Sequence, residues 1–215
     1  MRAALLLLAF AALATGCGNK PRQPDWLVNA DSAQERYQRA YLSGLDRVAS
    51  AEFARFRADV ASTAQPALVA RAELTRCAMQ VASLEFGPCE GFEAVRRDAP
   101  EAEVAYADFL AGRLPPERAA ALPEQYRGAQ AQATGAAVQG IQDPAARLVA
   151  AGALLRAGRA DPQVLQVAAD TASEQGWRRA VLAWLGAQAM RAEQAGASEE
   201  AARLRRRMAL AAQGL

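Results

Sequence analysis

The 215-residue chain contains no histidine. Imidazole is the commonest general base and the commonest metal ligand in proteins, so its absence excludes Ser-His-Asp and Cys-His catalysis and every His-ligated metal site. The sequence also lacks a Gly-rich phosphate loop, a Gly-x-Ser-x-Gly motif and a Cys-x-x-Cys pair. The formal net charge of +2 is too small to favour nucleic acid as a partner. We therefore expect no enzyme activity, no cofactor and no metal site.

Residues that favour β-sheet are scarce, whereas residues that favour helix are abundant. Ile141 is the only isoleucine and Lys20 the only lysine, while alanine and arginine are plentiful. Alanine loses no side-chain entropy in a helix, and β-branched residues are the ones that favour strands. This composition predicts an all-α fold without a sheet.

The first residues have the pattern of a secretory signal peptide. Arg2 supplies a positive charge, Ala3 to Leu13 form an apolar run, and small residues at positions 14–16 precede Cys17. The apolar run is shorter than the roughly 20 residues that a membrane-spanning helix needs. We expect residues 1–16 to direct export and to be removed.

Gly16 followed by Cys17 resembles the lipobox of bacterial lipoproteins. This resemblance implies cleavage before Cys17, a diacylglyceryl thioether on its sulfur and an acyl chain on its new amino group. Several acyl chains on one residue give stable membrane anchoring. Gly18 follows the cysteine, and in that family this implies sorting to the outer membrane, because retention in the inner membrane is mainly reserved for Asp there. A plain signal peptide with an incidental cysteine is the alternative.

The mature chain is expected to have a short tether and one helical domain. Residues 17–30, the lipidated cysteine and an extended tether, contain Pro21, Pro24 and few apolar groups. A single α-helical domain is expected to cover residues 31–215. Within it, residues 113–139 are predicted to be a poorly ordered insertion, because prolines interrupt the helical pattern there and apolar anchors are few.

Helix signals recur through the domain. Ser32 and Glu35 have the spacing of a capping box, and the pairs Asp143-Pro144 and Asp161-Pro162 each combine an N-cap with proline at the first helical position. We expect helices from Asp31, over 47–63, from Pro66, over 90–97, over 100–110, after each Asp-Pro pair, from Trp177, and in a last segment that holds Leu204 and Met208.

Two-helix units begin about 34 residues apart at Asp31, Pro66 and Pro100, and again at Asp143 and Trp177. Within the first unit, Gly44, Ala49 and Phe53 resemble the inter-helix glycine and the second-helix positions of tetratricopeptide repeats, and Gly196 with Ala201 repeats the first two. The resemblance implies stacked antiparallel helical hairpins, either a TPR-like α-solenoid or an irregular helical bundle.

Cys77 and Cys89 remain once Cys17 is acylated. An even pair in an exported protein favours a disulfide, provided that the chain turns at Gly87-Pro88 directly after the third helix. Their Cα atoms should then lie about 4.4–6.8 Å apart. Two unpaired thiols and a redox-active pair are the alternatives.

Two sets of side chains are candidates for a ligand or interaction surface. Trp177 and Trp184 are seven residues apart and fall on one helical face, so they either pack in the core or floor a ligand groove. Arg203 and Arg207 belong to a basic cluster in the C-terminal helix. This cluster either stabilises the negative end of the helix dipole in the final turns or contacts anionic lipid head groups.

The first functional hypothesis is a non-enzymatic lipoprotein of the outer membrane, on its periplasmic side, whose helical hairpins form a scaffold for another envelope protein. The alternative is a binder of a small or lipidic envelope ligand in an interhelical groove. A third is an envelope hydrolase that uses a carboxylate pair such as Glu52 with Asp59, or Glu73 with Glu85. The expected partners of the protein are the membrane, through the lipid anchor, and an envelope protein.

Overall fold

The computed structural model describes residues 22–213, and every regular element in this range is helical. The prediction of an all-α fold is therefore confirmed. The signal peptide and Cys17 lie outside the described residues. No helix within 22–213 has both the length and the apolar character needed to cross a membrane. The elements are α2 (Asp25–Leu42), α3 (Asp46–Ala61), α4 (Pro66–Ala82), α5 (Glu90–Glu93), η1 (Arg96–Asp98), α6 (Glu101–Leu110), η2 (Pro116–Ala121), α7 (Glu124–Gln132), α8 (Gly135–Gln139), α9 (Pro144–Arg156), α10 (Pro162–Glu174), α11 (Arg178–Gln194) and α12 (Ser198–Ala212).

The first helix begins earlier than predicted. Helix α2 starts at Asp25, directly after Pro24, so residues 25–30 are helical and the tether predicted for them is wrong. Ala30 and Ala33 are buried in a small cluster with residues of α3 and α4, including Phe56. This packing extends the helix through the expected capping box, because burial of an apolar face outweighs local capping preferences.

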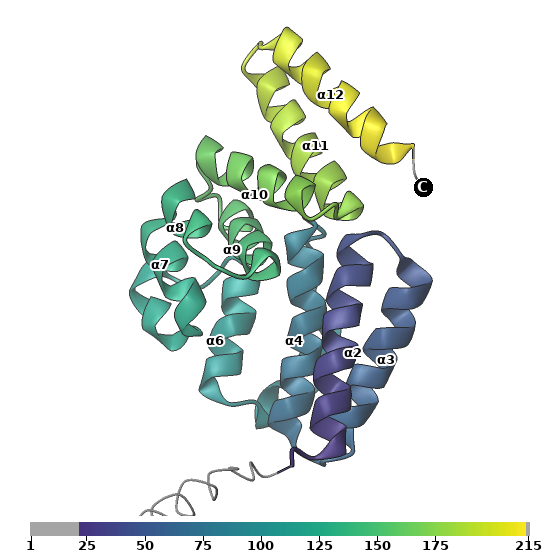
Figure 1. The fold of residues 1–215 in the computed structure, drawn as a ribbon. Helices are drawn as coiled ribbons and strands as arrows, with labels where there is room; N and C mark the ends of the chain where they lie inside the picture. Colours follow the sequence, from purple (N-terminus) through teal and green to yellow (C-terminus); the bar gives the residue numbers. More distant parts are fainter. Residues whose placement is uncertain (1–21, 214–215) are drawn as a thin grey trace, which may run out of the picture.

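Helices α4 and α9 form the centre of the molecule (Figure 1). Most of α9 is buried on all sides, and α4 is buried over its C-terminal half. Their backbones touch at Gly152: a Cβ atom added there would lie 2.9 Å from the carbonyl carbon of Val81 and closer still to its oxygen. The absence of a side chain at Gly152 therefore sets the spacing of the two central helices.

The two predicted inter-helix glycines and both predicted Asp-Pro caps are present. Gly44 between α2 and α3, and Gly196 between α11 and α12, have φ angles of +80° and +73°, a backbone conformation that glycine adopts without strain. Asp143 accepts a hydrogen bond from the amide of Ala146 at 2.6 Å, and Asp161 accepts one from Val164 at 2.7 Å. Both Asp-Pro pairs therefore begin helices, as predicted.

The helices form an irregular bundle. Helix α4 packs against α3, α6 and α9, and α11 contacts α2 (Figure 1). In a linear stack each unit contacts only its neighbours, so contacts between helices this distant in sequence are those of a bundle. Of the two architectures considered, the bundle describes this packing.

The expectation of a poorly anchored insertion at 113–139 is wrong. Pro116 begins η2 and Pro123 occupies the N-cap of α7, so the prolines start elements. Gln130 is buried, and its side chain donates a hydrogen bond of 2.5 Å to the carbonyl of Leu114. Several apolar anchors lie in the main core: Leu114, Leu122, Tyr126, Ala129 and Val138.

Helix α12 projects from the bundle and packs chiefly on α11, whereas α11 also packs on α10 and α2 (Figure 1). Apolar residues of α11 lie in the main core, and polar side chains of the same helix add contacts with α4 and with the start of α3. The indole of Trp184 is fully buried and donates a hydrogen bond of 2.9 Å to the carbonyl of Ala82 at the end of α4. Arg179 pairs with Asp46 and Glu85, and its guanidinium lies 4.2 Å from the ring centre of Tyr41.

Candidate functional site

A cleft of about 870 Å³ opens between α2, α4, α6, α9 and the η2–α7 segment. This volume lies within the range of ligand-binding pockets, about 300–1,000 Å³. Its floor comes from α4 and α9 and consists of small and flexible apolar side chains. They are Leu74, Ala78, Met79, Ala145, Ala146 and Val149. The alanines of the two central helices leave room for the cleft.

The walls of the cleft are polar. Gln34 and Gln38 are one turn apart on α2 and line it together with Thr75 of α4. Arg71 of α4 pairs at 2.7 Å with Glu103 of α6, a carboxylate that is only 7% exposed. This ion pair holds α4 and α6 together at the edge of the cleft.

Two tyrosines form the wall on the side of α6 and α7. The hydroxyl of Tyr106 donates to that of Tyr126 at 3.3 Å, and the rings stack with centres 5.4 Å apart. Burial raises the pKa of both phenols above the ordinary value. Both side chains therefore stay neutral at physiological pH and can donate or accept a hydrogen bond, but neither is a phenolate nucleophile.

The cleft continues toward the start of α11. A second hollow of about 550 Å³ shares Glu35, Gln38, Asp143 and Ala145 with the first and ends at Trp177. Trp177 is half-buried and precedes α11, whereas Trp184 is fully buried in the core. Core packing, the first of the two interpretations, therefore describes Trp184, and Trp177 packs against the same core. The alternative, one groove floored by both indoles, is not present, because of the two only Trp177 lines the hollow.

Two of the four carboxylates considered for a hydrolase, Glu52 and Glu73, link helices. Glu52 of α3 is buried and accepts a hydrogen bond of 2.9 Å from Arg36 of α2. Glu73 of α4 is buried and accepts one of 2.7 Å from Arg57 of α3. With Arg71 and Glu103 these pairs form a series that joins α2 to α3, α3 to α4 and α4 to α6.

Sequence reasoning missed this series of ion pairs. One sequence signal for a buried, paired glutamate was available: a glutamate on a helix face otherwise filled by alanine and aromatic residues. Glu52, between Ala49 and Phe56, is an example. A glutamate at such a position is seldom fully buried unless it is paired. The other two residues of the proposed hydrolase pairs, Asp59 and Glu85, do not form an acid–base pair with Glu52 or Glu73. Glu85 accepts a hydrogen bond of 2.9 Å from the hydroxyl of Tyr41.

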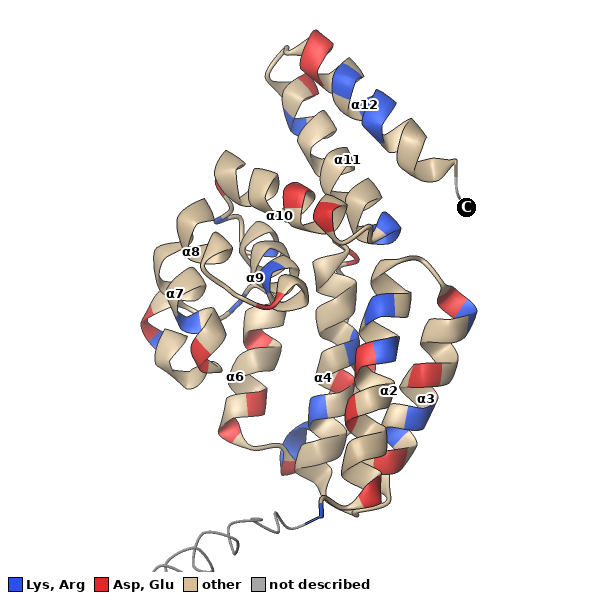
Figure 2. Cartoon of the chain, viewed as in Figure 1, with Lys and Arg blue, Asp and Glu red and all other residues tan. Residues whose placement is uncertain are grey.

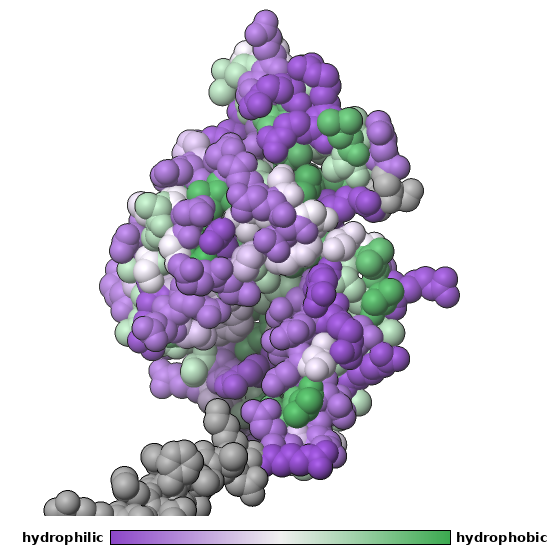
Figure 3. Space-filling model, in the orientation of Figure 1, coloured by the Kyte–Doolittle hydropathy of each residue, from purple (hydrophilic) through white to green (hydrophobic). Residues whose placement is uncertain are grey.

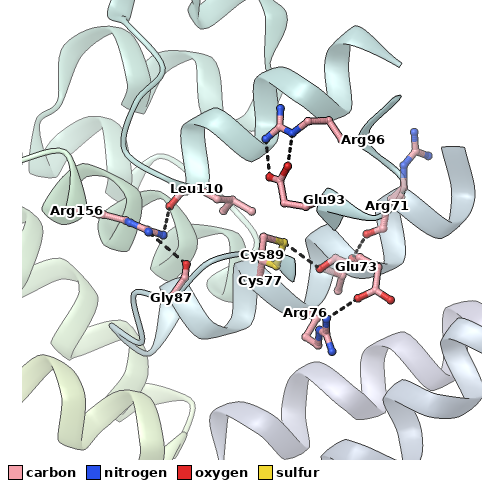
Figure 4. Close-up of a disulfide and its surroundings, with 11 residues drawn as sticks. Arg71, Glu73, Arg76, Cys77, Gly87, Cys89, Glu93, Arg96, Leu110 and Arg156 are labelled. Atoms are coloured by element: carbon pink, nitrogen blue, oxygen red, sulfur yellow. Dashed lines mark hydrogen bonds and ion pairs between the residues drawn. A yellow bond between two sulfur atoms is a disulfide. The ribbon is translucent and has the colours of Figure 1, made fainter. Parts of the chain in front are cut away.

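The predicted disulfide is present between Cys77 in α4 and Cys89 just before α5, with Cα atoms 5.8 Å apart (Figure 4). The chain reverses at Gly87-Pro88, as the prediction required. On the same side, Arg156 at the end of α9 donates hydrogen bonds of 3.3 Å to the carbonyls of Leu110 and Gly87. These contacts tie the reversal to α6 and α9.

The basic cluster lies in the middle of α12 because the helix continues to Ala212. The prediction that these arginines occupy the final turns is therefore wrong. Arg203 forms an ion pair with Glu200 at 2.6 Å. Arg207 is half-buried beside it.

Among residues 22–213, no group of three or more cysteine, aspartate or glutamate side chains could hold a metal ion. No protein-family model, curated protein or solved structure matches this chain. Its function must therefore be argued from its own residues, because fold alone does not imply function.

Proposed function

We propose that this protein is a lipid-anchored, non-enzymatic protein of the outer membrane that binds a polypeptide segment of another envelope protein in the cleft between α2, α4, α6 and α9. The signal pattern that ends at Cys17 supports the location. The lining of the cleft is the single observation that supports the ligand class.

The cleft combines the two features that an extended polypeptide needs. Glutamine side chains, such as Gln34 and Gln38 on one wall and Gln125 on the other, carry both a donor and an acceptor. They can therefore match the amide and carbonyl groups of a bound backbone. The alanines of the floor, such as Ala78 and Ala146, leave space for apolar side chains of modest size.

A lipid ligand is supported less well. An acyl chain needs a lining that is apolar throughout, whereas this cleft carries the Arg71–Glu103 ion pair and several amide groups on its walls. A sugar ring would need an open aromatic face, but Tyr106 and Tyr126 stack on each other. These features favour a polypeptide over the small or lipidic ligand considered as the alternative.

Two of the acidic groups of the cleft have structural roles, which supports binding without catalysis, and a third, Glu35, lies exposed on its α2 wall. Glu103 is paired with Arg71, and Asp143 caps α9. A general acid or base must be within hydrogen-bond reach of the proton that it transfers and must have a matched pKa. The two tyrosines remain protonated and cannot act as bases at neutral pH.

We expect that a photo-crosslinking amino acid at Gln38, in the native envelope, will trap a polypeptide in the cleft. Ala102→Trp should abolish this product, because Ala102 is exposed at the edge of the cleft and an indole there would narrow it. Ala58→Trp is the matched control, since Ala58 is an exposed alanine of α3 that does not line the cleft. The crosslinked product is identified by mass spectrometry.

Two outcomes would contradict polypeptide binding at this site. One is a product that contains only lipid or a small molecule. The other is a polypeptide product whose yield is the same in Ala102→Trp and in Ala58→Trp. Thermal unfolding of both variants shows whether each remains folded, so that a lost product can be attributed to the blocked cleft.

A further inference from the structure

Charge is divided unequally between the body of the protein and its C-terminal hairpin. Residues 178–212, which form α11 and α12, contain seven arginines and three glutamates. Residues 22–177 contain 16 arginines and 20 aspartates and glutamates. A positively charged hairpin therefore projects from a negatively charged body (Figure 2).

Part of the positive charge of α12 lies on the side that faces away from α11, whereas Arg205 pairs with Glu193 of α11. Ala201 and Leu204 are buried, and Met208 packs against the same core. Helical spacing places Arg203, Arg206 and Leu210 on the opposite side. We call these three residues together with the adjacent Arg207 the outer stripe.

The outer stripe has both unpaired charge and exposed apolar surface. Within residues 22–213, Arg206 and Arg207 form no ion pair, whereas Arg203 and Arg205 pair with glutamates of the hairpin. The side chain of Leu210 is 70% exposed, the largest value among the exposed large apolar residues in that range. Figure 3 shows that the projecting end of the molecule is mostly hydrophilic, with a small apolar group beside it. Arginines around an apolar contact are common at protein–protein interfaces.

The position of the hairpin excludes two groups that could otherwise cover the outer stripe, the anchoring membrane and the N-terminal segment. The start of α2 and helix α12 lie at opposite ends of the molecule (Figure 1). Only seven residues separate Cys17 from Asp25, which span at most about 25 Å when extended. With the proposed anchor at Cys17, the outer stripe points away from the membrane that holds the protein. Neither the lipid head groups of that membrane nor the N-terminal segment can then cover it.

We propose that the outer stripe of α12 is a second interaction surface, which docks an acidic polypeptide surface with an apolar residue opposite Leu210. Carboxylates of the partner pair with Arg206 and Arg207, and opposite charges speed association and fix its register. Leu210 supplies an apolar contact that charge alone does not provide. The orientation relies on the anchor proposed at Cys17, but the charge division and the stripe do not.

Two labelled peptides of equal length and charge test this proposal, one a repeat of Glu-Glu-Leu and the other a repeat of Glu-Glu-Ser. Binding to the full-length protein in detergent is measured by fluorescence anisotropy at several salt concentrations. Arg206→Gln/Arg207→Gln should weaken binding of the leucine peptide roughly five- to tenfold, since it removes two ion pairs. The matched control Arg47→Gln/Arg97→Gln makes the same charge change at exposed positions of the body and should change binding less than about twofold.

Leu210→Ala separates docking from diffuse attraction. The wild-type protein should prefer the leucine peptide over the serine peptide, and Leu210→Ala should remove this preference while leaving the salt dependence unchanged. Equal losses in the two arginine double variants would overturn the proposal, as would equal binding of the two peptides. Tighter binding of phosphatidylglycerol vesicles through the same arginines would identify a membrane surface instead. Ala102→Trp should leave peptide binding unchanged, so failure here is distinguishable from failure of the cleft.

Discussion

Gly152→Ala should be among the most destabilising single substitutions in this protein. The added methyl group would overlap the backbone of Val81, and backbone atoms cannot rotate away as a flexible side chain can. Helices α4 and α9 would have to move apart, which disturbs the packing at the centre of the bundle. Overpacking of this kind costs about 3 kcal/mol, or roughly 10 °C in melting temperature for a domain of this size. Urea and thermal unfolding followed by circular dichroism measure the change.

Gly128→Ala is the matched control. Gly128 lies within α7, and an added Cβ atom there would have no neighbour within 4 Å. Alanine is favoured over glycine inside a helix by about 1 kcal/mol, so this variant should be slightly more stable than the wild type. If Gly152→Ala were as stable as Gly128→Ala, the close contact between α4 and α9 would be refuted.

Reduction of the Cys77–Cys89 disulfide should have the next largest effect. The bond closes a loop with a sequence separation of 12 residues, and loss of such a cross-link raises the entropy of the unfolded chain. The expected loss is close to 3 kcal/mol in the free energy of unfolding. Urea unfolding with and without a reductant measures it directly.

The Cys77→Ala/Cys89→Ala variant controls for other effects of the reductant. Its urea unfolding midpoint should be lower than that of the oxidised wild-type protein and should not change when reductant is added. Identical midpoints for the oxidised and reduced wild-type protein, or free thiols at both positions in protein isolated from the envelope, would contradict the predicted role of the bond.

Local sequence signals located most helices because these signals act over a few residues. The side chains of Asp143 and Asp161 cap α9 and α10 as their pairing with proline predicted. Gly87-Pro88 likewise predicted the reversal that brings Cys89 beside Cys77. Each of these features depends on neighbours along the chain, so periodicity and turn chemistry suffice to find it.

The errors arose where contacts between distant residues decide the structure. Helix α2 begins at Asp25 because Ala30 and Ala33 are buried against other helices, which capping preferences cannot reveal. Residues 113–139 looked polar and interrupted, yet Tyr126 and Gln130 are buried there. A buried glutamine and an exposed one have the same sequence signature, and only the position of its partner, the carbonyl of Leu114, distinguishes them.

The cleft could not be predicted from the sequence. Its walls come from segments as distant as Gln34 and Val149, and no motif connects them. The sequence did single out Trp177 as a candidate for a ligand surface, and Trp177 lines the second hollow. The reason was its helical spacing to Trp184, however, and Trp184 lies in the core. Sites that form between helices of a bundle depend on how the helices pack, and packing angles are not encoded in any single segment.

The proposal that this is an envelope lipoprotein is tested most directly at Cys17. We expect the wild-type protein to remain with membranes after a carbonate wash, and its intact mass to equal that of a chain that begins at Cys17 with acyl groups attached. Cys17→Ser should lose the anchor and keep its uncleaved signal segment, because no other residue in the lipobox can be acylated. Membrane retention of a processed Cys17→Ser protein, or a wild-type mass without acyl groups, would contradict the proposal.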